Sequence, residues 1–151
     1  KYLLADDLLG RAGFSWYEIS NWSTSSAARC RHNLRYWRSQ DWWGIGPGAH
    51  SHLGQRRWWN VKHPSAYAAK LAAGELPIAG HELLDDQMVA LEEVMLQIRL
   101  SDGMPIESLD PDRVPPLIAR GLLVQHRLAA DRVVLTMKGR LLGDAVAREL
   151  V

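Results

Sequence analysis

The chain has 151 residues, a formal net charge of +1 and one cysteine, Cys30. This length suffices to bury a hydrophobic core, in one domain or in two small ones. The near-neutral charge favours no polyanionic partner, the single cysteine excludes an internal disulfide, and no apolar run approaches the length of a membrane span. No secretory leader follows Lys1, so we expect a cytoplasmic protein that is not integral to a membrane.

The first half is predicted to begin with a helix and a strand. Leucines at helical spacing indicate a helix over residues 1–12, and the apolar run at residues 14–20 indicates a strand directly after it. The polar residues 22–28 are typical of a loop. Glu18 stands near the end of the strand, where it is either a hydrogen-bonding group that faces a ligand or an edge carboxylate paired with a nearby arginine.

The next segment is the densest in charged and aromatic residues. Residues 28–38 are expected to form one or two helical turns, with Arg31, Arg35 and Arg38 on one face. Guanidinium groups form bidentate contacts with carboxylates, so this face suits an acidic ligand. Residues 42–45, which contain two tryptophans, are predicted to be a short buried strand.

His32 and Tyr36 are four residues apart and would share an adjacent helix face. Such a pair can address one ligand, with the imidazole on a metal ion and the phenol on the periphery of the ligand. A lone histidine is more often a hydrogen-bonded structural residue, and Cys30 is a rival ligand two residues away. From the residues alone, these alternatives stay open.

A glycine-rich turn, Gly-Pro-Gly-Ala at residues 46–49, precedes His50 and Ser51. Its glycines serve either a tight strand exit or a backbone surface against which a cofactor lies. His50 and His52 would face the same side of an extended chain, where they could pinch a metal ion. No third ligand is evident nearby.

The aromatic residues divide the chain, because all seven tryptophans lie between Trp16 and Trp59 and no aromatic residue follows Tyr67. We therefore predict two units, residues 1–76 and residues 77–151. In chain order we expect a strand (56–61), a helix (64–74), a connector (75–82), a long helix (84–100), a short helix (114–120), two strands (122–124 and 133–135) joined by a polar hairpin, and a last helix capped by Thr136 with Leu141, Leu142, Val146 and Leu150 inward.

Four strings of the sequence stand out: Tyr17–Asn21, Arg31–Trp37, Gly44–Ser51 and Trp59–Lys62. Together they resemble the HemW family of heme chaperones in the radical S-adenosylmethionine superfamily, and HNxxYW at residues 32–37 is the most specific string. The resemblance implies an α/β fold. Residues 1–76 would be the last strands and helices of an incomplete radical S-adenosylmethionine barrel of the TIM type, and residues 77–151 a small helical domain similar to a winged helix.

The resemblance also implies site residues. Heme is expected to contact His32, Asn33, Tyr36 and Trp37, with His32 as the candidate ligand of the heme iron. S-adenosylmethionine is expected to lie against Gly46, Pro47, Gly48, Ala49, His50 and Ser51, mainly against their backbone. We expect no catalytic residue in this chain, and the CxxxCxxC motif that holds the family's 4Fe–4S cluster is missing from it.

The function that the resemblance implies is that of a chaperone that binds heme and delivers it to acceptor proteins such as those of respiration. One alternative is the oxygen-independent coproporphyrinogen III oxidase of porphyrin biosynthesis. A third class is a nucleic-acid-binding winged helix, against which the acidic Asp144 and Glu149 of the last helix argue. Because an incomplete barrel exposes sheet edges and apolar faces, the isolated chain is expected to form homodimers or to aggregate.

Overall fold

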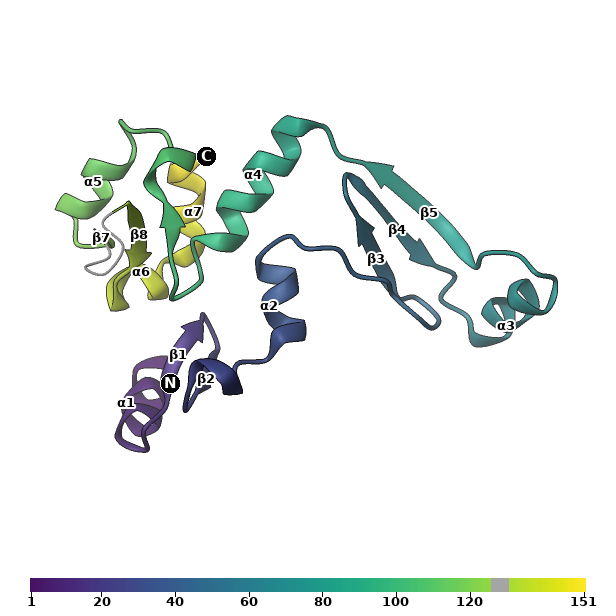
Figure 1. Cartoon of the computed structure of the whole chain (residues 1–151), viewed down its shortest axis with the longest axis horizontal. Helices are drawn as coiled ribbons and strands as arrows, with labels where there is room; N and C mark the ends of the chain where they lie inside the picture. The colour runs from purple at the N-terminus through teal and green to yellow at the C-terminus, as the bar shows by residue number, and fades with distance from the viewer. Residues whose placement is uncertain (126–130) are drawn as a thin grey trace. The chain divides into compact units, whose positions relative to one another are not determined.

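A computed structural model describes residues 1–125 and 131–151 of the chain (Figure 1). Its α-helices are α1 (Tyr2–Arg11), α2 (Arg31–Trp37), α3 (Pro64–Ala72), α4 (Asp86–Gln97), α5 (Val114–Ala119), α6 (Met137–Leu141) and α7 (Gly143–Leu150). Its β-strands are β1 (Ser15–Glu18), β2 (Asn21–Ser23), β3 (His50–Leu53), β4 (Arg56–Asn60), β5 (Ile78–Leu83), β6 (Met104–Pro105), β7 (Leu123–Gln125) and β8 (Arg132–Leu135). No helix in this described part has the length and apolarity that crossing a membrane requires.

Local rules explain where several of the predicted helices begin. Pro64 occupies the first turn of α3, where its missing N–H costs nothing. Thr136 caps α6 as predicted, because its Oγ1 accepts a hydrogen bond from the Gly139 N–H at 3.0 Å. Asp85 accepts a hydrogen bond from the Met88 N–H at 2.8 Å and so caps α4. These polar caps confirm the helix starts that the sequence indicated.

The first predicted loop is partly a strand. Residues 21–23 form β2, which pairs antiparallel with β1, and a short 3-10 turn, η1 (Ser26–Ala28), follows it. The prediction of a loop over residues 22–28 is therefore wrong at its start. The serine and threonine residues indicated a loop, but residues 21–23 pair with the free edge of β1 and so form a strand.

The described chain divides into two compact units, residues 1–38 with residues 91–151, and residues 39–90. Four of the seven tryptophans fall in the second unit. The division at residues 76 and 77 that composition indicated stays a prediction. The mixed α/β composition is confirmed, and the strands of each sheet in the described residues pair antiparallel.

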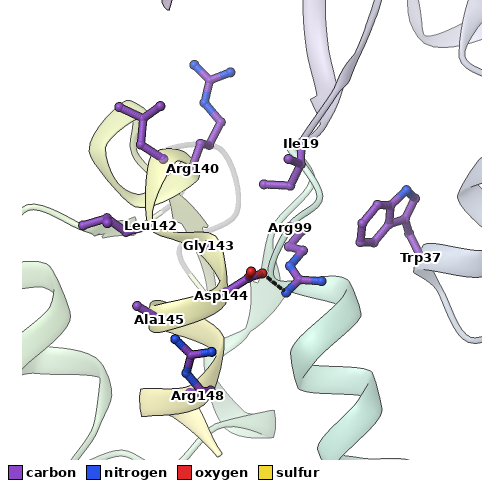
Figure 2. A pocket seen from close by; sticks show the side chains of 10 residues that line it. Ile19, Trp37, Arg99, Arg140, Leu142, Gly143, Asp144, Ala145 and Arg148 are labelled. Carbon is purple, nitrogen blue, oxygen red and sulfur yellow. Dashed lines mark hydrogen bonds and ion pairs between the residues drawn. The ribbon is translucent and has the colours of Figure 1, made fainter. Parts of the chain in front are cut away.

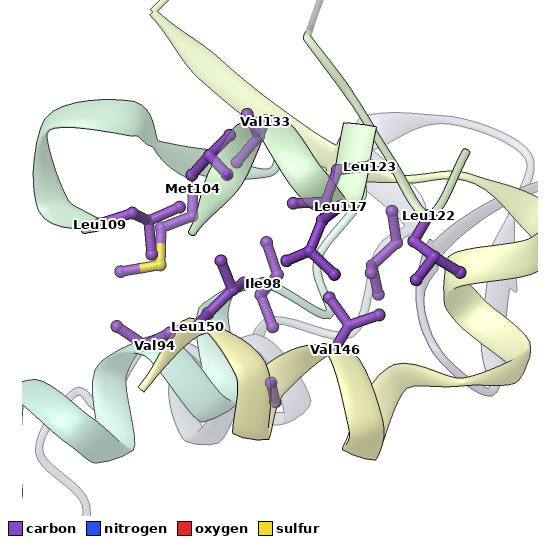
Figure 3. Close-up of a cluster of buried hydrophobic side chains, with 13 residues drawn as sticks. Val94, Ile98, Met104, Leu109, Leu117, Leu122, Leu123, Val133, Val146 and Leu150 are labelled. Atoms are coloured by element: carbon purple, nitrogen blue, oxygen red, sulfur yellow. The ribbon is translucent and has the colours of Figure 1, made fainter. Parts of the chain in front are cut away.

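The main core of the first unit is a group of buried apolar residues, called here the aliphatic cluster (Figure 3). Its buried members are Val94, Ile98, Met104, Leu109, Val114, Leu117, Leu122, Leu123, Val133, Leu135, Val146, Ala147 and Leu150. They come chiefly from α4, α5 and α7 and from a sheet with strand order β6-β8-β7. Each fully buried aliphatic side chain contributes about 1.5–3 kcal/mol, so burial is the main source of stability in this unit.

The last predicted helix is divided in two at Leu142, which separates α6 from α7. Val146 and Leu150 are buried as predicted, with 0% and 4% of their surface exposed. The prediction for Leu141 and Leu142 is wrong, because both are nearly half exposed. A break in the helix resets the direction of its side chains, so one apolar stripe does not run through all four positions.

Strands β7 and β8 pair antiparallel, as predicted from the two apolar runs at residues 122–124 and 133–135. The polar hairpin predicted between them lies outside the described residues. The winged-helix interpretation of this region stays a prediction.

Residues 39–90 are organised around an antiparallel sheet with strand order β3-β4-β5, called here the aromatic sheet (Figure 1). Trp58 of β4 lies opposite Ser51 of β3 and His81 of β5. Because successive side chains of a strand alternate, Trp58 and Trp59 point to opposite faces. The predicted strand at residues 56–61 is confirmed as β4.

The short buried strand predicted at residues 42–45 is not formed. Trp42 makes only an isolated bridge with His52, and Trp43 and Ile45 are 60% and 84% exposed. An apolar composition indicated burial, but this segment lies along the sheet without entering its ladder.

The predicted connector at residues 75–82 is instead largely strand β5, which pairs with the open edge of β4. Pro77 directly precedes the strand, and Gly80 lies inside it. A Cβ atom at Gly80 would lie 2.5 Å from Cζ2 of Trp59, so the glycine makes room for the indole. Gly80 therefore serves the packing of an indole and does not mark a connector.

Candidate functional site

Glu18, at the end of β1, is a buried hydrogen-bond acceptor. Its residue is 1% exposed, and its carboxylate accepts hydrogen bonds from Asn33 Nδ2 at 3.3 Å, from the Ser20 N–H at 3.4 Å and from the side chain of Asn21. The hydrogen-bond partners of Glu18 are therefore two asparagine side chains and one backbone N–H. The sequence had offered a ligand or an arginine as its partner. The bond to Asn33 ties the start of α2 to β1.

Helix α2 carries the HNxxYW string, and its inward face packs on the unit. Leu34 is 7% exposed and forms a small core with Tyr17 and Leu100, against which Trp37 packs. Asn33 lies four residues before Trp37 and donates its hydrogen bond to Glu18 on the same inward side. Two of the four predicted heme-contacting residues are thus held within the fold.

The other two residues of the string lie on the outer surface of α2. His32 is exposed, and Tyr36 is 38% exposed. Tyr36 Oη lies 3.1 Å from His32 Nε2, and the two rings meet edge to face with centroids 4.9 Å apart. The predicted i, i+4 pair is therefore present, and the phenol orients the imidazole at the surface.

The predicted arginine face is only partly available. Arg38 binds the carboxylate of Asp102 at 2.9 Å, and Arg29 binds the same carboxylate at 2.7 Å. Burial raises the pKa of Asp102, but the hydrogen bonds and charges of Arg29 and Arg38 hold that pKa below its ordinary value. Arg31 and Arg35 are exposed and make no ion pair within the residues that the structure describes. Two cations of α2 therefore remain for an acidic ligand.

A cavity of about 430 Å³ lies beside Trp37 (Figure 2). Arg99 stands between Trp37 and Asp144, with its guanidinium carbon 5.9 Å from the indole ring centre and its Nη2 2.6 Å from the carboxylate. Arg140 also lines the cavity and is likewise held in an ion pair, at 2.9 Å. Arg148 makes no ion pair with any described residue. Carboxylates therefore neutralise two of the three arginines of the cavity, and Arg148 is the one that no described residue pairs.

The glycine-rich turn at residues 46–49 is fixed by hydrogen bonds within its own unit. The Gly46 N–H donates to Tyr67 Oη at 3.1 Å, and the Gly48 N–H donates to the carbonyl oxygen of Val61 at 2.9 Å. Gly46 and Gly48 have φ angles of +112° and +68°, which L side chains rarely adopt. The glycines are therefore required by the geometry of the turn, whatever lies against it.

Two buried side chains of the aromatic sheet clamp the segment before the turn. Asn60 is 4% exposed and donates from Nδ2 to the carbonyl oxygens of Gly44 and Gly46, at 3.2 and 3.0 Å. Ser51 is 1% exposed, and its Oγ accepts a hydrogen bond from the Gly44 N–H at 2.9 Å. Sequence reasoning included Ser51 but missed Asn60. The available signal was an amide at the end of an apolar, aromatic strand.

The two histidines after the turn have different environments. His50 is exposed and stacks on Trp59, with ring centroids 6.0 Å apart. His52 is 7% exposed and lies against Trp42, with ring centroids 4.8 Å apart. Each imidazole is engaged with an indole, so the two are not presented together to a metal ion.

The turn suits S-adenosylmethionine as a source of carbonyl oxygens rather than of N–H groups. The N–H groups of Gly44, Gly46, Gly48 and Ala49 all donate within the unit, and Pro47 has none. Of the turn's carbonyl oxygens, those of Gly46 and Ala49 already accept hydrogen bonds. Those of Pro47 and Gly48 accept none from the described residues, and the positively charged sulfonium group of S-adenosylmethionine is compatible with them. The residues present therefore fit this cofactor.

The chain does not hold a complete ligand set for an iron–sulfur cluster. A 4Fe–4S cluster is bound by about four thiolates, whereas Cys30 is the only cysteine in the sequence. Its thiol is exposed on the approach to α2. No chemistry of a cluster can be assigned to these residues.

Comparison with known proteins gives a consistent result. No family model matches the chain. Over its whole length the chain is 49% identical to the heme chaperone HemW of Mycobacterium tuberculosis, of which it spans 38%. Over 89% of its length it is 30% identical to HemW of Bacillus subtilis, of which it spans 37%. The chain thus spans less than two fifths of these curated relatives.

A solved structure shares the fold. The coproporphyrinogen III oxidase HemN from Escherichia coli, a radical S-adenosylmethionine enzyme, matches 98% of this chain with a TM-score of 0.64. The match covers 39% of the HemN chain, and the sequences are 14% identical. At this identity the likeness shows the fold alone.

Proposed function

This chain corresponds over its whole length to the C-terminal part of the HemW-type proteins, and we propose that it contributes a heme-contacting surface to a heme chaperone. The relatives named above are described as heme chaperones, which supports heme as the cargo. The full protein would bind heme and pass it to acceptor proteins, among them respiratory ones. We place this function in the cytoplasm.

The outward pair of α2 carries the proposal. His32 is exposed, and imidazole is a common ligand of heme iron. Tyr36, 3.1 Å from its Nε2, orients the ring and gives way when iron takes that nitrogen. Arg31 and Arg35 are the exposed cations of the same short helix and would pair with the propionates of the heme.

The inward pair has a positioning role in this proposal. Asn33, bound to Glu18, and Trp37, packed on the core around Leu34, fix the rotation of α2 about its axis. They would act on heme through the orientation of His32 rather than by contact. This refines the expectation that all four residues of the string touch heme.

The glycine-rich turn is the proposed contact for S-adenosylmethionine. Within residues 46–49, the carbonyl oxygens of Pro47 and Gly48 would be available to the cofactor, with His50 exposed beside the turn, and Ser51 would support the turn from within the sheet. The sulfonium group supplies the positive charge that these oxygens would face. A 4Fe–4S cluster would require cysteines that this chain does not contain.

The enzymatic alternative is an oxygen-independent coproporphyrinogen III oxidase. The 49% identity to a heme chaperone, against 14% to the oxidase HemN, favours the chaperone. Incubation of the full-length protein with coproporphyrinogen III, S-adenosylmethionine and a reductant separates the two. Decarboxylated product at enzymatic rates would replace the chaperone proposal.

Heme titration of the full-length protein, followed by the Soret band, tests the proposal. We expect saturable binding that His32→Ala weakens at least tenfold, because the iron loses its ligand. His63→Ala is the matched control, since His63 is an exposed histidine outside α2. If His32→Ala binds heme like the wild type, or if His63→Ala is equally impaired, the assignment to α2 is wrong.

A further inference from the structure

Strand β5 is an edge strand, because the aromatic sheet has the strand order β3-β4-β5 (Figure 1). Along an antiparallel strand, residues alternate between those whose backbone bonds the neighbouring strand and those whose N–H and C=O groups point away from it. The Leu84 N–H donates to the carbonyl oxygen of Gln55, on the side of β4, at 2.8 Å. The backbone groups of Leu83 and His81, in the alternate positions, therefore point to the open side of β5.

The open edge of β5 lacks the usual protection against pairing with another chain. Protected edges carry lysine, proline, inward-pointing charges or bulges. Strand β5 has the sequence Ile-Ala-Gly-His-Glu-Leu, and its one carboxylate, that of Glu82, is held by Arg57 at 2.7 Å. The register of β5 with β4 is regular from Gly80 to Leu83, and its one shift lies before Gly80. The last residues of β5 can therefore accept a further strand.

The face of the sheet that carries Trp58 holds a pocket of about 340 Å³, called here the indole pocket. Its apolar walls include Trp43, Leu53 and Leu76, which are 60%, 52% and 63% exposed. Trp43 stands nearly perpendicular to the buried Trp58, with ring centroids 4.9 Å apart. Single exposed apolar residues are ordinary, but a group of them around one hollow marks a binding surface. The indole pocket suits an apolar side chain of a partner.

Two polar side chains of the indole pocket, those of Arg56 and His81, make no hydrogen bond or ion pair within the residues that the structure describes. In the register of β4 and β5, His81 lies opposite Trp58 and Leu83 lies opposite Arg56. Because side chains of a strand alternate, these four residues share one face of the sheet. His81 thus joins the pocket to the open edge, since its side chain lines the pocket and its backbone groups point outward. Arg56 offers an unpaired positive charge beside it.

We propose that the open edge of β5 and the indole pocket form one docking site for an extended peptide segment of a heme-acceptor protein. The segment would add a strand beyond β5, with its backbone bonded to His81 and Leu83 and an apolar side chain in the pocket. A carboxylate two residues from that side chain would lie beside Leu83 and meet Arg56. In such strand addition, backbone hydrogen bonds supply affinity and pockets for alternate side chains supply specificity. This inference rests on the proposed function, because the acceptor is the partner that this function requires.

Peptide binding to the full-length protein tests the docking site. The probe is a fluorescein-labelled heptapeptide with a central leucine, a glutamate two positions to either side and threonine elsewhere, so that it fits a strand of either direction. We expect fluorescence polarization to show saturable binding that Arg56→Gln weakens about tenfold, because the carboxylate loses its guanidinium partner. Leu83→Pro should abolish binding because proline has no N–H, whereas Leu83→Ala, the matched control, should retain it. Proline is tolerated at an edge position whose N–H faces away from the sheet, so the two Leu83 variants should unfold at similar temperatures.

The outcomes separate the docking site from the proposed function, because none of these changes lies in α2. If the peptide fails to bind while the wild type still takes up heme, the docking site is wrong and the proposed function stands, as when the rest of the full-length chain covers the edge. Equal binding of a peptide with lysine in place of glutamate, or unchanged binding by Leu83→Pro, would also overturn the docking site. A dimer that Leu83→Pro dissociates in sedimentation would assign the edge to a second copy of the chain and overturn the peptide segment. No heme uptake by the wild type would overturn both, because it removes the acceptor.

Discussion

The aliphatic cluster and the aromatic sheet are stabilised in different ways. In the aliphatic cluster, side chains such as Ile98, Leu117 and Val146 are at most 1% exposed. In the aromatic sheet, large apolar residues such as Leu53 and Leu83 are 52% and 69% exposed. The sheet instead uses backbone hydrogen bonds, stacked rings and buried amide clamps. Its exposed apolar groups are therefore not part of a hydrophobic core.

The largest expected difference between the two regions is the cost of deleting a leucine side chain. Leu117→Ala should lower the free energy of unfolding by about 2–5 kcal/mol, because it leaves a cavity among packed aliphatic groups. Leu53→Ala, its matched control in the aromatic sheet, should cost less than about 1 kcal/mol because Leu53 is 52% exposed. Urea unfolding followed by circular dichroism measures both. Equal losses would mean that Leu53 belongs to a core and would remove the contrast.

A second test concerns a close backbone contact within the unit of residues 39–90. A Cβ atom on Gly44 would lie 2.0 Å from the carbonyl oxygen of His50, so the strand β3 would have to move. Gly44→Ala should therefore destabilise the protein by about 1–3 kcal/mol, as overpacking does. Gly10→Ala is the control: no atom lies within 4 Å of its added Cβ, and in helix α1 it should stabilise by about 0.5–1 kcal/mol. If Gly44→Ala unfolds at the same temperature as the wild type, the backbone around Gly44 has room for a methyl group and the expectation is wrong.

The smallest expected effect involves a charged pair in the unit formed by residues 1–38 and 91–151. Arg140 binds Asp6 at 2.9 Å, and Trp22 Nε1 donates to the same carboxylate at 2.8 Å. The hydrogen bond from Arg140, which outweighs the opposing effect of burial, lowers the pKa of Asp6 from its ordinary 3.8. Asp6→Asn should cost about 1–2 kcal/mol at neutral pH. A depressed pKa stabilises the folded state above the ordinary value, so this cost should shrink as the pH falls below about 4.

Chemical unfolding at several pH values checks this dependence. Asp7→Asn is the control, because the ion pair of Asp7 with Arg11 is exposed and should contribute at most about 0.5 kcal/mol. A cost of Asp6→Asn that stays constant down to pH 3 would show that the carboxylate charge does not stabilise the pair.

The sequence by itself determined the elements whose causes are local. Thr136 predicted a helix start because a short polar side chain caps the nearest free N–H groups. The helix predicted from residue 64 begins there because proline fits the first turn of a helix. The spacing of His32 and Tyr36 predicted their pairing, because residues four apart meet on any helix. His32 and Tyr36 belong to the HNxxYW string, the most specific part of the family resemblance.

Only the tertiary structure decided which residues of the HNxxYW string point inward. The family resemblance gave Asn33 and Trp37 the same standing as His32 and Tyr36, but contacts with Glu18 and Leu34 hold the first two inward. Strand β5 escaped prediction because Pro77 and Gly80 indicated a connector. Its cause lies elsewhere in the chain: the segment pairs with the free edge of β4, and Gly80 leaves room for the indole of Trp59. Which side chains remain available for a ligand depends on pairings between distant segments, and no local pattern records them.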